Sequence, residues 1–186
     1  MRKAFILIFS VFVSIITIPV TAGAKNVTVG IETGYFAPID KNFTEIYGSG
    51  DVTFGVNAAY RFLKYLSIQT AYNQYNAYGE PLIPGFDLNV GLKTLRIGGF
   101  FQLNLKRFIP KGGGGFAKTW VNGETPFGSI DDSKSGWFLG TGADIRVFKN
   151  FLTGFELLYN DVAFTVNNTA VSVGGLSFLV SFKVEI

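Results

Sequence analysis

Eight ionisable side chains interrupt segments of the chain that otherwise alternate between apolar and small residues. Acids and bases in such positions can pair with one another or serve as general acids and bases. The eight residues are Glu32, Arg61, Arg96, Asp144, Arg146, Glu156, Lys183 and Glu185. Because a single buried charge is costly, we expect these side chains to neutralise one another inside the fold.

The residue types on which most enzymes depend are missing from this chain. It has no His and no Cys, so it cannot form a Ser-His-acid triad, a thiolate nucleophile or a zinc-cysteine site. Glu32 and Glu156 could act as an acid pair on glycosides, but an inward position in a filled interior gives a substrate no access. Asp131 and Asp132 are more typical of a solvated loop than of a Ca²⁺ site. We therefore expect no enzymatic activity, no cofactor and no metal site.

The composition is that of one ordered domain. The 186 residues are 48% hydrophobic, 16% aromatic and 16% charged, whereas soluble domains carry roughly 25% charged residues. Disordered chains are poor in aromatic residues, which excludes that class. The net charge of +3 includes Arg2 and Lys3, and no basic stripe follows them, so we expect no nucleic-acid partner.

The start of the chain has the pattern of a secretory signal peptide. Met1-Arg2-Lys3 is basic, residues 4–20 are nearly all apolar, and Ala22-Gly23-Ala24 is a cleavage pattern. The alternative is a transmembrane helix, but that needs about 20 apolar residues and this run is shorter. We predict a signal peptide over residues 1–24 and a single exported domain over residues 25–186.

Eight later segments alternate with a period of two, which is typical of β-strands with two unlike faces. They lie near residues 27–36, 52–62, 66–73, 95–105, 108–121, 137–147, 153–159 and 176–186. The segment 108–121 is the weakest, because four consecutive glycines erase its alternation and leave its faces unassigned. Leu88, Val90 and Leu92 have the opposite parity from Leu95 onward, which predicts a β-bulge or a strand end beyond a membrane.

The connections between these segments alternate in length. Long polar connections are expected near residues 38–50, 79–87, 122–135 and 160–170, and short turns near Lys64, Lys106 and Lys149. The lysines are 42 (106 − 64) and 43 (149 − 106) residues apart, which is a repeat of one hairpin. An even number of strands with short turns at one end and longer loops at the other is the layout of an outer-membrane barrel.

The alternation is compatible with two opposite barrels. In a lipocalin-like carrier the apolar face encloses a ligand, whereas in a membrane barrel it contacts lipid. The mixed face is rich in small residues, which suits a narrow interior, and aromatic residues such as Tyr65, Trp137 and Phe151 collect near strand ends, as in membrane girdles. We therefore place the apolar face outward and the eight charges in the lumen, where we expect them to form a plug rather than an ion path.

Three segments carry a family resemblance. They are Phe108–Ala117 with its Pro and glycines, Phe155–Tyr159 with its inward Glu, and the last strand, whose outward residues are Phe178, Val180, Phe182, Val184 and Ile186. With them, residues 25–186 resemble the small outer-membrane barrels typified by the transmembrane domain of outer-membrane protein A. The last strand is similar to the C-terminal signal that barrel-assembly machinery recognises, although that family usually ends in Phe or Trp.

This resemblance implies an all-β fold, an eight-stranded antiparallel up-and-down transmembrane β-barrel of the porin family in the outer membrane of a Gram-negative cell. The implied partners are outer-membrane lipid, lipopolysaccharide and the barrel-assembly machinery. The expected function is structural and non-enzymatic, with loops presented at the cell surface for interaction or adhesion to an unknown ligand. A soluble or secreted lipocalin-like barrel that carries an apolar ligand is the alternative.

Overall fold

The computed structural model describes residues 26–79, 88–125, 128–166 and 169–186. The predicted signal peptide and most of the loop predicted at 79–87 lie outside the described residues. Most of the described chain is β-strand. Among the described residues, no helix has the length and apolar character needed to cross a bilayer.

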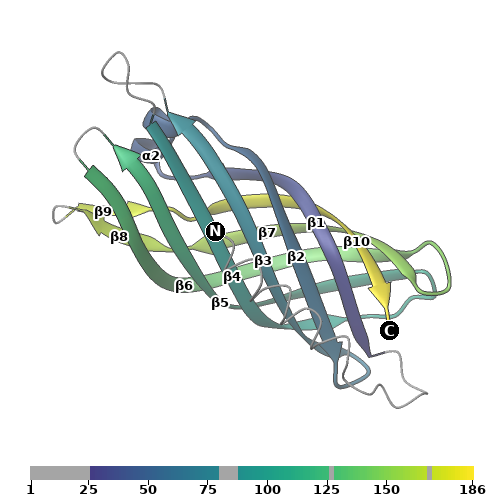
Figure 1. Cartoon of the computed structure of the whole chain (residues 1–186). Coiled ribbons are helices and arrows are strands. Elements are labelled where there is room, and N and C mark those ends of the chain that lie inside the picture. Colours follow the sequence, from purple (N-terminus) through teal and green to yellow (C-terminus); the bar gives the residue numbers. More distant parts are fainter. Residues whose placement is uncertain (1–25, 80–87, 126–127, 167–168) are drawn as a thin grey trace.

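Eight strands form one closed barrel. They are β1 (Val27–Pro38), β2 (Asp51–Arg61), β3 (Leu66–Gly79), β4 (Leu88–Gln102), β5 (Phe108–Thr125), β6 (Gly128–Arg146), β7 (Phe151–Asp161) and β10 (Gly175–Glu185). Each pairs antiparallel with its neighbour, and β1 closes the ring by pairing with both β2 and β10 (Figure 1). Closure gives every strand of this ring two neighbours, and backbone groups inside a bilayer require this. The predicted fold class is confirmed.

The short turns lie at one end of the barrel, as predicted. Residues 62–65 join β2 to β3, residues 103–107 join β4 to β5, and residues 147–150 join β6 to β7. In the second turn, the backbone N–H of Leu105 donates to Phe108 O at 2.9 Å and that of Phe108 donates to Leu105 O at 3.1 Å. These two bonds enclose a two-residue hairpin loop, Lys106-Arg107.

One expected break in the strands is wrong. The segment 122–135, predicted as a loop, is mostly β5 and β6, which pair from Phe108↔Ile145 as far as Thr125↔Gly128. The polar sequence there does not prevent strand formation, because ladder hydrogen bonds need no apolar side chains. The four glycines of β5 are also fully paired, with β4 on one side and β6 on the other.

Of the two alternatives predicted before Leu95, a β-bulge or a strand end beyond a membrane, the β-bulge is absent, since β4 keeps one continuous register with β3 and with β5 over its described residues. The parity changes for a different reason. Val90 and Leu92 are buried, so the inward face of β4 changes from polar at Arg96 to apolar nearer the loops. The apolar residues of β4 therefore lie on both faces of a regular strand.

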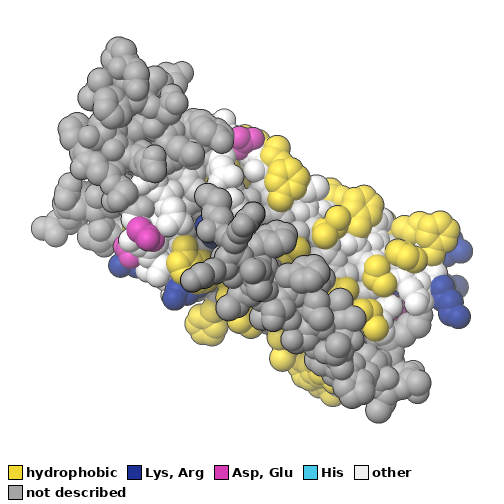
Figure 2. Space-filling model, viewed as in Figure 1, with side chains coloured by type: hydrophobic (Ala, Val, Ile, Leu, Met, Phe, Trp, Pro, Cys, Tyr) yellow, Lys and Arg dark blue, Asp and Glu magenta, His cyan; other side chains and the backbone are white. Residues whose placement is uncertain are grey.

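The outer face of the barrel is apolar. Each of the eight strands carries at least two large hydrophobic side chains that are more than a third exposed, among them Phe101 at 51%, Ile145 at 40% and Phe182 at 61%. Figure 2 shows hydrophobic side chains along the described wall, with basic groups at the right-hand end and further basic groups in the left half of the view. This is the orientation predicted for a membrane barrel and the reverse of the lipocalin-like alternative, in which these side chains would surround a central hollow.

The loop end of the lumen is covered by two small elements. Helix α2 (Lys41–Tyr47) belongs to the first loop, and a hairpin of β8 (Ala163–Val166) and β9 (Thr169–Ser172) belongs to the last. Asp40 joins them, because its Oδ1 accepts the N–H of Phe43 at 3.2 Å and its Oδ2 accepts the N–H of Ser172 at 3.1 Å. Their buried side chains continue an apolar cluster at this end of the interior: Phe36, Phe43, Tyr75, Val90, Leu92, Val121, Val162, Phe164 and Val173.

Candidate functional site

The eight charged residues predicted for the lumen all belong to barrel strands and differ in their exposure. Glu32, Arg96, Glu156, Lys183 and Glu185 are buried. The side chains of Asp144, Arg61 and Arg146 are 13%, 22% and 33% exposed. Alternation explains the placement, because every second residue of a closed sheet must point to the interior. Their contacts divide them into three groups.

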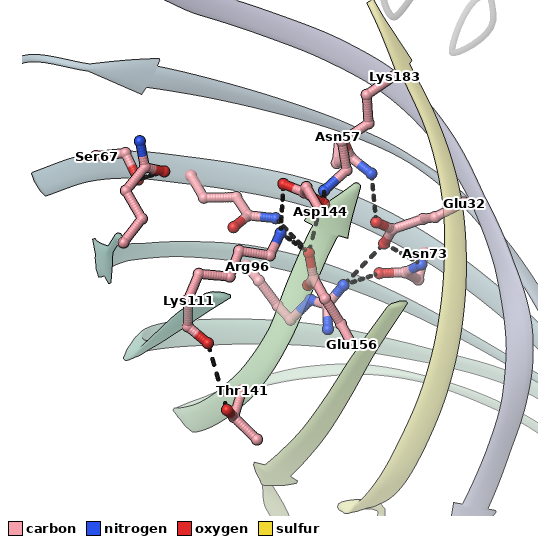
Figure 3. A network of polar contacts seen from close by, with 12 residues as sticks. Glu32, Asn57, Ser67, Asn73, Arg96, Lys111, Thr141, Asp144, Glu156 and Lys183 are labelled. Carbon is pink, nitrogen blue, oxygen red and sulfur yellow. Dashed lines mark hydrogen bonds and ion pairs between the residues drawn. The ribbon is translucent and has the colours of Figure 1, made fainter. Parts of the chain in front are cut away.

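The first group is centred on the Glu32 carboxylate. Arg96 Nη2 donates to Glu32 Oε1 at 2.9 Å, and the amide nitrogen of Asn73 donates to the same oxygen at 2.7 Å. Asn57 Nδ2 donates to Glu32 Oε2 at 2.6 Å (Figure 3). Arg96 Nη2 also donates to Asn73 Oδ1 at 2.6 Å. Both carboxylate oxygens therefore have donors, as a charge inside a barrel requires.

The second group joins two acids to two lysines. Glu156 pairs with Lys111, and with Lys183 at 3.3 Å. Asp144 pairs with Lys183 at 2.8 Å and with Lys111 at 3.4 Å. Gln69 Nε2 donates to Glu156 Oε1 at 3.3 Å. Each lysine thus bridges both carboxylates, and the four charges cancel.

Lys111 belongs to this network although the sequence analysis did not place it in the lumen. It follows Pro110 and precedes the four glycines that erase the alternation of β5. A usable signal was present, because Phe108 and Phe116 are an even number of residues apart and are 42% and 80% exposed. Lys111 has the opposite parity from both, so it must point inward.

Two aromatic rings lie between the groups. The centroids of Phe100 and Phe138 are 6.1 Å apart. Arg96 Cζ lies 5.9 Å from the centre of the Phe138 ring, and Lys111 Nζ lies 6.0 Å from that of Phe100. These are cation–π distances. The rings therefore fill the lumen between the two groups while contacting one cation from each.

Glycines make room for these rings. A Cβ placed on Gly98 would lie 2.7 Å from Phe138 Cζ, and one on Gly113 would lie 2.8 Å from Phe100 Cγ. Real Cβ atoms essentially never approach so closely. Gly98 of β4 and the glycine run of β5 thus leave the space that the aromatic side chains of the lumen occupy. The same glycine run weakens the alternation of β5.

Gly98→Ala is expected to lower the free energy of unfolding by about 1–3 kcal/mol, because overpacking forces side chains and strands to shift. The adjacent Gly99→Ala is the matched control, since a Cβ there meets nothing within 4 Å. Urea unfolding of both variants in the same detergent measures the difference. A Cβ on Gly98 would also lie 2.5 Å from Gly114 O, so equal stability of the two variants would show that neither Phe138 nor Gly114 restricts this space.

The third group lies at the turn end. Glu185 pairs with Arg61 at 3.5 Å and with Arg146 at 2.8 Å. The five residues of the predicted assembly signal lie on the same last strand or directly after it. They all face outward, with exposures of 64% for Phe178, 47% for Val180, 61% for Phe182, 37% for Val184 and 39% for Ile186.

Apart from an open hollow at the turn end, the spaces inside the described barrel are small. One cavity of about 30 Å³ includes Tyr75 and Asn160 in its lining, one of about 10 Å³ includes Gln69 and Glu156, and one of about 30 Å³ includes Ser67 and Gln102. Each has room for about one water molecule. Among the described residues, Tyr75 Oη and Asn160 Oδ1 are buried without a hydrogen-bond partner, and both residues line the first cavity.

This interior has little chemistry to offer a substrate. Glu32 and Glu156, the acid pair considered for glycosides, are each held by a cation. Within the described ranges, no group of three or more acidic side chains could hold a metal ion. Asp131 and Asp132 belong to β6, where Asp131 accepts from Asn122 at 3.1 Å and Asp132 lies 3.5 Å from Lys134.

Solved structures resemble this barrel closely in fold and little in sequence. Neisserial surface protein A has 14% identity and a TM-score of 0.66, covering 88% of this chain and 98% of its own. Outer membrane protein OprG of Pseudomonas aeruginosa has 13% identity and a TM-score of 0.66, covering 87% and 95%. Ail, the attachment invasion locus protein of Yersinia pestis, solved with the heparin analogue sucrose octasulfate, has 15% identity and a TM-score of 0.51, covering 85% and 96%.

No protein-family model matches the chain, and no curated protein matches its sequence significantly. The likeness to solved structures extends along almost their whole length and includes the closed ring of eight antiparallel strands. The chain therefore has the fold of the small eight-stranded outer-membrane β-barrels.

Proposed function

We propose that this chain is a non-enzymatic protein of the outer membrane with a structural role, exported by residues 1–24 and inserted by the barrel-assembly machinery. The observation that carries the proposal is the apolar outer face, which includes exposed large side chains on every barrel strand. Soluble monomers rarely expose apolar patches larger than about 300–600 Å². Lipid, with lipopolysaccharide in the outer leaflet, is the environment that satisfies such a surface.

Strand lengths support the same proposal. The shortest barrel strands, β2, β7 and β10, have 11 residues each, and a tilted transmembrane strand needs about 9–11. β5 and β6 have 18 and 19 residues. The residues of β5 and β6 beyond the length needed to cross a bilayer are polar and lie at the loop end. This is expected if the two strands extend out of the membrane.

Cell fractionation tests this location. The protein is expected in the membrane fraction, released by detergent but not by gentle lysis, and its migration on a denaturing gel is expected to change on heating. Recovery of the folded protein in the soluble periplasm would contradict the proposal.

The lumen is proposed to be closed to ions. The support is the paired network of Arg96, Lys111 and Lys183 with three carboxylates, together with cavities of no more than about 30 Å³. Eight strands leave little more than side-chain space. Purified protein in planar bilayers is expected to give no discrete conductance steps, and regular openings at neutral pH would show an ion path instead.

The loops are proposed as an interaction or adhesion surface. Ail, which shares the fold, is an attachment protein solved with a heparin analogue. In this chain the loop end carries α2 and the β8–β9 hairpin. An epitope inserted after Gly48, an exposed residue at which an added Cβ would meet no atom within 4 Å, tests the orientation. Antibody is expected to label intact cells with this insertion but not with one after Lys149, and the reverse would place the loops inside.

A further inference from the structure

The turn end of the barrel opens into a polar hollow. It has a volume of about 410 Å³ and is lined by Arg61, Asn104, Lys106, Arg146 and Glu185. These residues come from β2, the β4–β5 turn, β6 and β10, so parts of the chain that are distant in sequence border the hollow, which is open to the outside. Its lining contains three cations and one carboxylate, which leaves a net charge of +2.

Glu185 holds the two arginines of this hollow in place and leaves a donor of Arg146 unused. Its carboxylate lies 2.8 Å from Arg146 Nη2 and 3.5 Å from Arg61 Nη2. Arg146 Nε is buried and has no hydrogen-bond partner among the described residues. Nε itself is closed to the hollow, but the Arg146 side chain as a whole is 33% exposed and lines the hollow. A guanidinium fixed by one carboxylate is ready to receive a second anion.

Lys106 supplies a second, independent observation. Its φ is 59°, and it is the only non-glycine residue with positive φ in the described chain. It is the first of the two residues in the Lys106-Arg107 hairpin loop, and a positive φ at that position alone is the pattern of a type II′ turn, which favours glycine. Strained backbone conformations cluster at functional sites, and Lys106 lines the hollow, so its ammonium group is a candidate contact for a ligand there.

We propose that this hollow binds a phosphate group, with Arg61, Arg146 and Lys106 as its donors. Guanidinium groups match phosphate oxygens with paired donors, and a lysine adds a mobile positive charge. The phosphate can belong to a soluble phosphorylated molecule or to the headgroup of a phospholipid at the same rim. Both sources share the chemistry of the site, and the experiment separates them.

The test is a titration of the full chain, folded in a zwitterionic detergent, with inorganic pyrophosphate. Calorimetry gives the affinity, and the arginine Nε–Hε resonances report which side chains respond. One saturable site per chain is expected, with a shift of the Arg146 resonance. Arg146→Gln is expected to weaken the affinity at least about tenfold, because it removes a charge-assisted contact.

Lys106→Gly separates binding from folding. Glycine suits the positive φ, so the turn is expected to form as well as before, while the affinity for pyrophosphate falls about fivefold to tenfold. Arg107→Gln is the matched control, because it removes the same charge from the same two-residue loop at a residue outside the lining of the hollow. Its affinity is expected to stay within about twofold of the original.

Two results would overturn the proposed site. One is the absence of saturable pyrophosphate binding. The other is an equal loss of affinity in Arg107→Gln and Lys106→Gly, which would indicate a diffuse basic rim. Nanodiscs then identify the source of the phosphate. If discs that contain phosphatidylglycerol compete with pyrophosphate and discs of phosphatidylcholine alone do not, the ligand is an anionic headgroup; equal affinity in both discs assigns a soluble ligand.

Discussion

Val180→Arg is expected to lower the free energy of unfolding of the barrel in a lipid bilayer by about 2–4 kcal/mol. Val180 is the central residue of β10, faces outward, and is 47% exposed. It pairs with Phe155 of β7, whose side chain is 52% exposed on the same face. An arginine here must lie in hydrocarbon or bend toward the interface, and both are costly.

Val147→Arg is the matched control. Val147 is similarly exposed, at 51%, but lies in the β6–β7 turn, at the end of the barrel. The same substitution near an interface costs about 0–1 kcal/mol. Urea unfolding in lipid vesicles measures both variants, and equal stability of the two would contradict a membrane that surrounds the middle of β10.

Glu156→Gln is expected to lower the free energy of unfolding by about 3–5 kcal/mol, because it leaves buried cations without their main counter-charge. Glu156 is 4% exposed and receives Lys111, Lys183 and the Gln69 amide. After the substitution, Asp144 is the only carboxylate of the described residues that pairs with the two lysines.

Adding Lys111→Met to Glu156→Gln is expected to recover part of this loss, since the double variant removes one charge of each sign. A double-mutant cycle gives the coupling energy of the pair. Glu45→Gln, on the exposed side of α2, is the control and is expected to change stability by less than about 0.5 kcal/mol. If Glu156→Gln behaves like Glu45→Gln, the second group of the lumen network contributes nothing to stability.

The barrel itself could be predicted because the period of two is a direct consequence of strand geometry. In β10 apolar residues recur at every second position from Leu176 to Val184, with Leu179 as the one apolar residue at an inward position, and the structure buries every second residue as expected. The boundaries of β5 and β6 could not be predicted in this way. Their loop ends are polar on both faces, so the sequence lacks the contrast that marks a strand.

The parity change in β4 predicts a β-bulge only if the inward face of the sheet is expected to stay polar along its whole length. In this lumen the interior changes character along the axis, from ion pairs around Arg96 to an apolar layer at Val90 and Leu92. A regular strand that crosses both layers has the sequence pattern of a bulge. Only the pairing of β4 with β3 and β5 distinguishes a regular strand from a bulged strand here.

The ion-pair partners could not be predicted either, since they do not lie directly opposite one another in the strand register. Glu32 of β1 pairs with Arg96 of β4, and two strands separate them in the ring. Lys183 of β10 lies opposite Leu152 in the register, yet it pairs with Glu156 on that strand and with Asp144 of β6. Contacts across a lumen depend on barrel diameter and stagger, which no single strand encodes.

The most direct test of the membrane orientation is to observe which side chains contact lipid. The chain reconstituted in bilayers, with its phenylalanine and leucine side chains labelled for NMR, gives cross-peaks between lipid acyl chains and nearby protons. Cross-peaks are expected for Phe155 and Phe182, which are 52% and 61% exposed, and none for Phe100 and Leu158, which are 2% and 1% exposed. Acyl-chain contacts at Phe100 and Leu158, with none at Phe155 and Phe182, would contradict the outward orientation of the apolar face.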